Sequence, residues 1–251
     1  LLQFGMGNFL FFKNYLDSFR TQEFLVSMKN TFILTFSVVS LEFCIALGLG
    51  LILNRSDIKG KNIYTIVLMI PIMMPPIAVG LIWRLLLHPD LGIVNYVIGL
   101  VGAPKLGWYG DPKLAMLTVI GVDVWHETSL ILIIILAGLT SLDKTPYEAA
   151  RVDGASSIQT FLYITLPMLT PVIMVALLIR MIAAIKTYDL IYILTRGGPG
   201  FRTETMSYYV YKTAFRTLSM GEAAAQSFIL LIIILVFSLI LIRVMERRRL
   251  D

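Results

Sequence analysis

The chain has 251 residues, of which 57% are hydrophobic and only 15% are charged, and its mean hydropathy is +0.82. Soluble domains carry about a quarter charged residues, so this composition excludes an ordinary soluble domain and indicates a chain surrounded mostly by lipid. The net charge of +5 does not indicate a nucleic-acid partner, because the basic residues stand at the ends of apolar runs rather than in one patch.

Five segments are apolar and long enough to cross about 30 Å of hydrocarbon. We expect them to be helices, because backbone groups in lipid must be paired within the structure, and barrel strands are about half as long and alternate. The sequence therefore predicts an all-α, polytopic transmembrane helical bundle. Its expected spans are residues 31–53, 63–87, 114–139, 169–185 and 223–242.

Residues 1–25 precede the first span and are rich in aromatic side chains, which favours a periplasmic, interfacial segment. These aromatic residues are Phe9, Phe11, Phe12, Tyr15 and Phe19.

The second span contains Pro71, Pro75 and Pro76. Each proline removes a backbone donor, so we expect this helix to kink or break. Two interpretations remain open for the break, a packing kink and a gating hinge.

Basic residues orient the bundle. The connection 54–62 holds Arg55, Lys59 and Lys61, and the tail after residue 242 holds four arginines. Both segments are therefore predicted to be cytoplasmic. Alternation of the spans then places 141–167 in the cytoplasm and 88–113 and 191–222 outside.

Ionisable residues inside spans are costly in lipid and mark either a pathway or interhelical ion pairs. Asp123 and Glu127 are four residues apart, so they share one helix face. They could line a cavity in which Trp125 stacks on a sugar, or Arg180 could pair with Asp123 or Glu42. The candidate pathway residues are Glu42, Asp123, Trp125, Glu127, Arg180 and Tyr188.

The loop 141–167 is polar and helix-forming. Thr145 or Asp143 can cap a helix that starts near Pro146, with Glu148 in its first turn, where the helix dipole favours a carboxylate. Gly154 can end this helix.

A second helix is expected from about Ser156 to Leu166-Pro167. The loop as a whole fits either a docking surface or a solvated amphipathic connection.

The residues and their spacing in this loop form a specific sequence motif. Glu148-Ala149-Ala150, three residues, Gly154, nine residues and Ile164-x-Leu166-Pro167 resemble the coupling-loop motif of ABC importer permeases. The resemblance implies that the loop docks on an ATP-binding subunit, with Glu148 as the acidic contact. The implied docking residues are Glu148, Ala149, Ala150, Asp153, Gly154, Ile164, Leu166 and Pro167.

A second resemblance lies in the outer segment 194–215. It is similar to the periplasmic loop of carbohydrate-uptake permeases of the binding-protein-dependent, maltose type, and specifically to the larger of the two maltose-type permeases; Arg196 stands where the usual form has Gly. A tight turn and a substrate contact both remain open for it. A phosphate cradle does not fit, since no Gly-Lys-Ser/Thr follows. The residues implied to face the binding protein are Gly197, Gly198, Pro199 and Gly200.

The resemblance covers nearly the whole chain and implies a permease domain over 26–246, with the coupling loop at 141–167 and a cytoplasmic tail at 247–251. The family normally has six spans, so we expect a helix before Leu1 to be missing.

The implied partners are a homologous second permease subunit, two ATP-binding subunits that carry ATP and Mg, an extracytoplasmic binding protein, the lipid bilayer and a small carbohydrate. No nucleic-acid partner is expected. The implied location is the bacterial or archaeal cytoplasmic membrane, with several spans and a cytoplasmic C-terminus.

An enzyme is not expected. His88 and His126 are too few and too separated for a typical metal site, and neither a Ser-His-Asp set nor a nucleotide-binding loop can be assembled. Two alternatives to an importer subunit remain, a secondary transporter and a membrane assembly subunit that carries no substrate.

Overall fold

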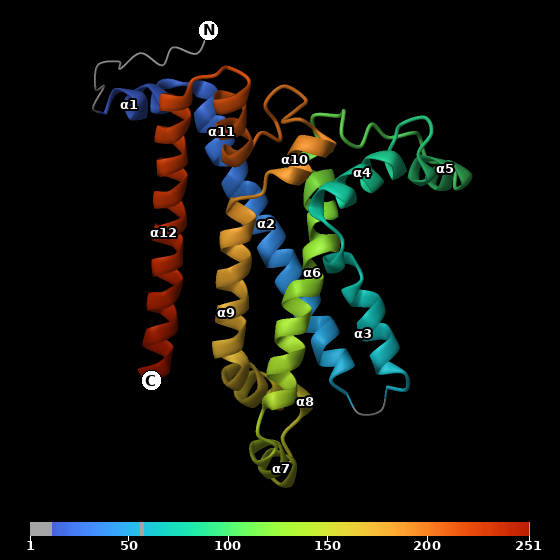
Figure 1. Cartoon of the computed structure of the whole chain (residues 1–251). Coiled ribbons are helices and arrows are strands. Elements are labelled where there is room, and N and C mark those ends of the chain that lie inside the picture. Colours follow the sequence, from blue (N-terminus) through green and yellow to red (C-terminus); the bar gives the residue numbers. More distant parts are fainter. Residues whose placement is uncertain (1–11, 56–57, 251) are drawn as a thin grey trace. The chain divides into compact units, whose positions relative to one another are not determined.

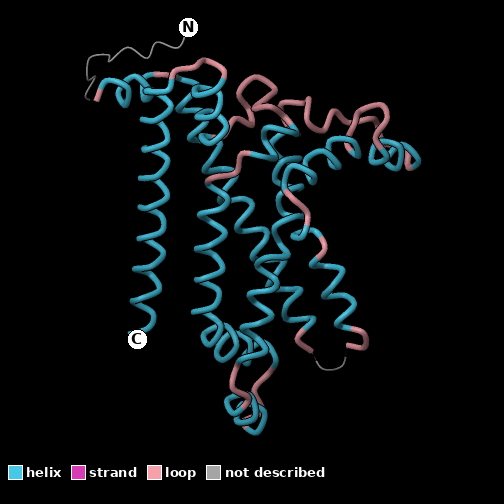
Figure 2. Tube along the Cα trace, viewed as in Figure 1, coloured by secondary structure: helices cyan, strands magenta, loops and turns pink. Residues whose placement is uncertain are grey.

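The computed structural model describes residues 12–55 and 58–250, without the side chains of 244–250. Phe9, Phe11 and the side chains of Arg247, Arg248 and Arg249 lie outside that description. Across the described residues the chain is helical and contains no strand, which confirms the all-α class (Figure 2). The α-helices, labelled in Figure 1, are α1 Lys13–Arg20, α2 Gln22–Leu53, α3 Lys61–Met69, α4 Pro76–Leu86, α5 Ile93–Leu100, α6 Ala115–Ser141, α7 Thr145–Val152, α8 Ser157–Thr160, α9 Leu166–Ile185, α10 Asp189–Leu194, α11 Met206–Phe215 and α12 Met220–Leu250. Two short helical turns, η1 Pro71–Met73 and η2 Phe161–Thr165, lie between them.

Length and composition give four helices that could cross a membrane among the described residues, or five when the broken pair α3–η1 and α4 counts as one span. The four are Gln22–Leu53, Ala115–Ser141, Ser157–Leu194 and Met220–Arg243. They correspond to the predicted spans. Their helices extend past the predicted ends, because a helix can continue into polar residues outside the hydrocarbon.

The second span breaks at its prolines, as predicted. A 3₁₀ turn covers Pro71–Met73, Met74 and Pro75 are extended, and α4 starts at Pro76. Pro75 and Pro76 both lack the N–H that would continue the helix, while Pro76 suits the first position of a new one. The positions of the prolines in the sequence therefore determine where the helix breaks.

The chain divides into two compact units. Unit 1 comprises Leu1–Val38, Pro75–Asp123 and Ile182–Leu239, and unit 2 comprises Val39–Met74, Val124–Met181 and Ile240–Asp251. Each is described by itself.

Small residues bring the helices of unit 2 close together. A Cβ on Gly50 of α2 would lie 2.9 Å from Ile135 of α6, and one on Gly138 of α6 would lie 2.8 Å from Leu169 and Val172 of α9. Helices in membranes pack through such small residues. Around these contacts lies an apolar core that includes Ala46, Ile131, Leu132, Ile135, Leu169 and Ala176.

Unit 1 has an aromatic core. Phe24 of α2 and Tyr209 of α11 are buried with Met206 and Ile229, and the rings of Phe24 and Tyr209 lie 5.8 Å apart. In the same unit α4 lies against α10, where Gly80 approaches Ile193 at 3.0 Å (Figure 1).

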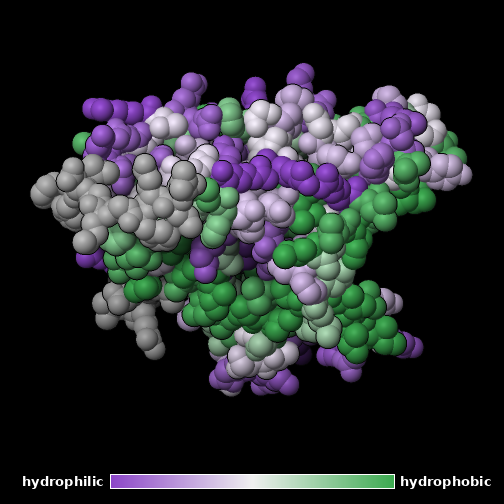
Figure 3. All heavy atoms as spheres, turned by 45° about the horizontal axis from the view of Figure 1, so that its top comes forward, coloured by the Kyte–Doolittle hydropathy of each residue, from purple (hydrophilic) through white to green (hydrophobic). Residues whose placement is uncertain are grey.

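Many large apolar side chains of the spans are exposed, among them Ile66, Leu81 and Leu235. Figure 3 shows hydrophobic side chains covering much of the drawn face, with hydrophilic ones gathered separately. A surface of this kind suits lipid rather than water.

Candidate functional site

The loop between α6 and α9 begins with a side-chain cap on α7. Asp143 Oδ1 accepts hydrogen bonds from the backbone N–H of Thr145 at 3.1 Å and from its hydroxyl at 3.0 Å. These bonds, the backbone one first, lower the pKa of the Asp143 carboxyl. Of the two residues expected to cap α7, Asp143 is the one whose side chain accepts from the N–H of the first helical residue, although Lys144 holds the N-cap position and makes no side-chain cap bond. Glu148 lies in the first turn as predicted.

Gly154 ends α7, also as predicted. It adopts φ +72°, the Ala155 N–H donates to the Ala150 carbonyl at 2.9 Å, and the Gly154 N–H donates to the Arg151 carbonyl at 3.3 Å. This pair of bonds is a Schellman motif, in which a glycine in the left-handed region closes a helix.

The next helix starts where it was predicted. Ser156 and Gln159 form a capping box: the Ser156 N–H donates to Gln159 Oε1 at 2.8 Å, and the Gln159 N–H donates to Ser156 Oγ at 3.3 Å.

Its predicted end at Leu166-Pro167 is wrong. The chain stays helical through the π turn η2 into α9, so Pro167 lies inside the first turn of a long helix. Proline is tolerated there, because its missing N–H falls next to a π turn, where the hydrogen-bond pattern already shifts by one residue.

The loop exposes a mixed polar and apolar surface at its tip, α7, which Figure 1 shows beyond the ends of α6 and α9. Glu148, Ala149 and Asp153 are exposed, whereas Ala150 is buried. Tyr147 braces the loop from inside, since its hydroxyl donates to Thr165 Oγ1 at 3.1 Å. Val152, Ile158 and Tyr163 are 87%, 71% and 76% exposed, which leaves apolar side chains for a partner to cover.

A hollow of about 370 Å³ adjoins this surface, lined by Asp153, Gly154, Tyr163, Ile164 and others. Leu166 is half-buried and Pro167 exposed. The structure thus gathers the motif residues on one loop, with Ala150 turned inward.

Two of the candidate pathway residues form a buried ion pair within unit 2. Arg180 Nε lies 2.6 Å from Glu42 Oε2, and Arg180 Nη2 lies 2.8 Å from Glu42 Oε1. The side chains are 2% and 0% exposed. Glu42, one of the two partners considered for Arg180, therefore pairs with it, in the bidentate geometry that makes such pairs strong.

Trp125 and Glu127 lie on the same helix, also in unit 2. Trp125 is 41% exposed and lines an apolar hollow of about 550 Å³ together with Pro71 of η1 and Ile45 of α2. Glu127 Oε1 is 3.0 Å from Nδ1 of His126, a buried histidine that sequence reasoning weighed only as a metal ligand. The signal that could have found this contact is its position beside Glu127 in an apolar run.

Asp123 and Tyr188 belong to unit 1. Asp123 is buried. Tyr188 stacks on Tyr192 at 5.5 Å and on Tyr208 at 6.2 Å, so it is part of a tyrosine cluster that sequence reasoning did not foresee.

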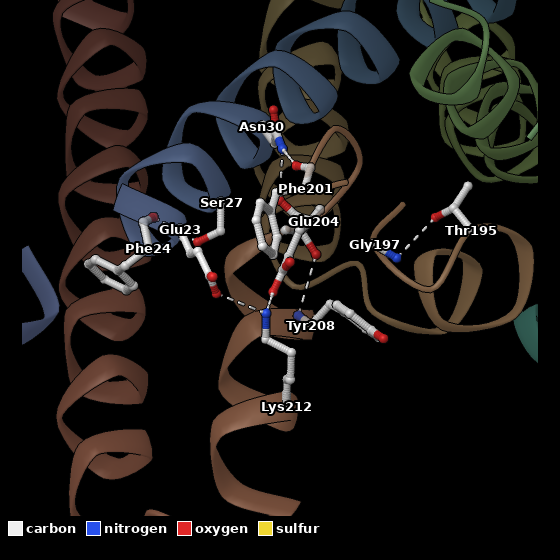
Figure 4. A network of polar contacts seen from close by, with 11 residues as sticks. Glu23, Phe24, Ser27, Asn30, Thr195, Gly197, Phe201, Glu204, Tyr208 and Lys212 are labelled. Carbon is white, nitrogen blue, oxygen red and sulfur yellow. Dashed lines mark hydrogen bonds and ion pairs between the residues drawn. The ribbon is translucent and has the colours of Figure 1, made fainter. Parts of the chain in front are cut away.

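The outer loop 194–205 is held by polar contacts within unit 1 (Figure 4). The Asn30 side chain donates to the carbonyls of Phe201 at 2.8 Å and Glu204 at 3.1 Å. The Lys212 ammonium lies 2.6 Å from Glu204 and 3.3 Å from Glu23. Burial raises the pKa of the Glu204 carboxyl, and the Lys212 ammonium opposes that rise. Asn30 and Lys212 were not singled out from the sequence as functional residues.

The turn itself is tight. Gly197 adopts φ +81°, and a Cβ there would lie 2.9 Å from the Tyr208 ring. Arg196, which replaces the usual glycine, also has a positive φ of 52°. Gly200 is the third residue of the turn in the left-handed region, with φ +62°. These angles account for the glycines by backbone geometry.

Residues 46–250 match the family described as "Binding-protein-dependent transport system inner membrane component". The chain belongs to this family. It is a membrane-spanning permease subunit of an ATP-driven ABC importer.

Proteins similar in sequence or fold include several permeases of ABC transporters. "Probable ABC transporter permease protein y4oQ" of Sinorhizobium fredii is 38% identical over 231 residues, which cover 92% of this chain and 74% of that protein. "Trehalose/maltose transport system permease protein MalF" of Thermococcus litoralis is 34% identical, covering 96% of this chain and 81% of that protein. One chain of a bacterial ABC transporter involved in the import of the acidic polysaccharide alginate has the same fold, with a TM-score of 0.88 at 24% identity, covering 96% of this chain and 85% of that one.

Proposed function

We propose that this permease forms half of the translocation pathway for a sugar or related solute, which an extracytoplasmic binding protein delivers. The observation that carries the proposal is the loop 141–167, where a helix capped at both ends presents Glu148 and exposed apolar side chains to a partner. The 34% identity to a trehalose/maltose permease supports a carbohydrate as the solute.

The energy comes from two ATP-binding subunits that carry ATP and Mg and dock on this loop, since no nucleotide-binding loop is present in the sequence. A homologous second permease supplies the other half of the pathway. The chain lies in a bacterial or archaeal cytoplasmic membrane with its C-terminus in the cytoplasm. The binding protein contacts the turn 197–200, and the Asn30 and Lys212 contacts hold Phe201 and Glu204, which follow that turn.

Within the membrane, the exposed ring of Trp125 is the surface on which a sugar face stacks, with Glu127, Asp123 and Tyr188 as further pathway residues. We assign the ion pair of Glu42 with Arg180 a structural role, because both side chains are buried and joined by two hydrogen bonds.

The test is the ATPase activity of the complex reconstituted in proteoliposomes. Maltose, trehalose and sn-glycerol 3-phosphate are added in turn, with and without the cognate binding protein. Stimulation by one solute only when the binding protein is present supports the proposal and names the solute.

A second arm uses Glu148→Lys, with Asp90→Lys on the outer segment as the matched charge reversal. We expect the ATP-binding subunits to co-purify with the Asp90 variant and to be lost from the Glu148 variant. Retention in both, with transport intact, would show that docking does not occur through Glu148, and the absence of any associated ATPase would favour a secondary transporter.

A further inference from the structure

Two side chains of α6 bond to the main chain of the broken second span. Ser129 Oγ donates to the Leu68 carbonyl at 2.6 Å, and His126 Nε2 lies 3.0 Å from the Met74 carbonyl. His126 and Ser129 are three residues apart, so they share one face of α6. All four residues belong to unit 2. The two bonds thus hold the backbone just before and just after η1.

The break explains why these carbonyls take side-chain donors. Pro71 has no N–H, and the N–H groups of Met73 and Met74 donate to Ile70 and Pro71, as in a 3₁₀ turn. Met74 itself is extended and precedes α4. Carbonyls released in this way within a membrane need a donor from a neighbouring helix, because lipid offers none.

His126 is held by its own neighbour. A carbonyl oxygen only accepts hydrogen bonds, so Nε2 must carry a hydrogen toward Met74. Nδ1, on the other side of the ring, lies 3.0 Å from Glu127 Oε1. Glu127 therefore orients the imidazole that bonds to the break, in the way a second group orients many functional histidines.

The position of α6 gives these bonds a consequence for transport. α6 ends at Ser141 and leads through three residues into α7, the helix proposed to dock on the ATP-binding subunit. A displacement of the loop therefore reaches α6 first, and any segment fastened to α6 moves with it.

We propose that His126 and Ser129 are positioning residues that clamp α3 and η1 to α6. Because of this clamp, α3 and η1 move together with α6 when the ATP-binding subunits hydrolyse ATP. The second span then bends mainly at Met74 and Pro75. The inference rests on the proposed function and favours the gating hinge over the packing kink for the proline break.

The experiment measures whether α3 follows α6. Val67 of α3 and Val124 of α6 line the same hollow and neither is buried, so both are replaced by Cys in a Cys44→Ser background. The assembled complex is cross-linked with a bis-maleimide without nucleotide and after trapping with MgATP and vanadate. With the clamp intact, we expect cross-linking rates that agree within about twofold between the two states.

Removing the clamp with His126→Leu and Ser129→Ala should make the rate differ by about fivefold or more between the states. The conservative pair His126→Gln and Ser129→Thr keeps both donors and should restore the state-independent rate, which a general loss of packing would not allow. If the leucine–alanine pair does not assemble, Ser129→Ala alone takes its place.

Two outcomes overturn the proposal. One is a cross-linking rate that differs between the nucleotide-free and the vanadate-trapped state when His126 and Ser129 are present. The other is a rate that is the same in both states after they are replaced by Leu and Ala. Co-purification of the ATP-binding subunits is recorded for every variant. Its absence in the unmodified complex would refute the proposed function instead, so the two failures are distinguishable.

Discussion

At the residue scale, two pairs of ionisable side chains inside the spans lie in direct contact. Glu42 and Arg180 form two hydrogen bonds in a site closed to solvent, and His126 Nδ1 lies 3.0 Å from Glu127 Oε1 beside the proline break. A single charge left in such a place is costly, whereas a complete pair is tolerated. The Glu42–Arg180 pair is therefore explained first by its own complementary charges.

Breaking the buried pair is expected to destabilise the protein more than removing it. Glu42→Leu or Arg180→Met alone leaves one buried charge, and we expect a loss of about 3–5 kcal/mol in the free energy of unfolding. The double variant should recover most of that loss. Unfolding by denaturant in detergent micelles measures all three.

The same variants separate structure from pathway. If the double variant folds and still takes up solute, the pair is structural. A stable double variant without uptake would instead show that Glu42 and Arg180 contact the solute.

At the element scale, local signals determine where the loop helices begin and end. Asp143, Gly154 and the Ser156–Gln159 box each act within a few residues, which is why they can be read from the sequence. The end of α8 could not be read in this way. Pro167 is compatible with both a stop and a first turn, and the choice depends on η2.

Gly154 should be intolerant of any side chain. Its φ of +72° costs an L-residue about 1–2 kcal/mol, although a Cβ would meet nothing within 4 Å. We expect Gly154→Ala to weaken co-purification of the ATP-binding subunit and Gly154→Pro to abolish it. Gly48→Ala is the control, because Gly48 is helical and equally open. Equal retention in the alanine variants would show that the Schellman turn is not needed for docking.

Gly138 should be intolerant for a different reason. A Cβ there would lie 2.8 Å from Leu169 and Val172, so Gly138→Ala must push α9 away from α6. Overpacking of this kind costs about 1–3 kcal/mol. Gly121→Ala, on the same helix with no atom within 4 Å, should be neutral. Thermal unfolding of the two variants in detergent gives the comparison, and equal midpoints would contradict close packing at Gly138.

At the scale of the whole molecule, family membership and the positive-inside rule together predict which ends of the spans face the cytoplasm. Lys144 of the loop should be cytoplasmic and Arg202 of the segment 191–222 external. In a Cys44→Ser background, an impermeant maleimide should label Arg202→Cys in intact cells and label Lys144→Cys only after permeabilisation. The opposite pattern would reverse the topology and place the docking loop outside.

The sequence by itself determined the helical class, the five spans, the proline break and the turns of the loop 141–167, because lipid solvation, missing donors and caps act over short stretches of chain. The motif also identified the family. Only the tertiary structure decided that Arg180 pairs with Glu42, that Ala150 turns inward, that α8 runs into α9, and that His126 and Ser129 reach the break. Those outcomes depend on which helices approach each other and at what height, and residues far apart in the chain carry no local signal of that approach.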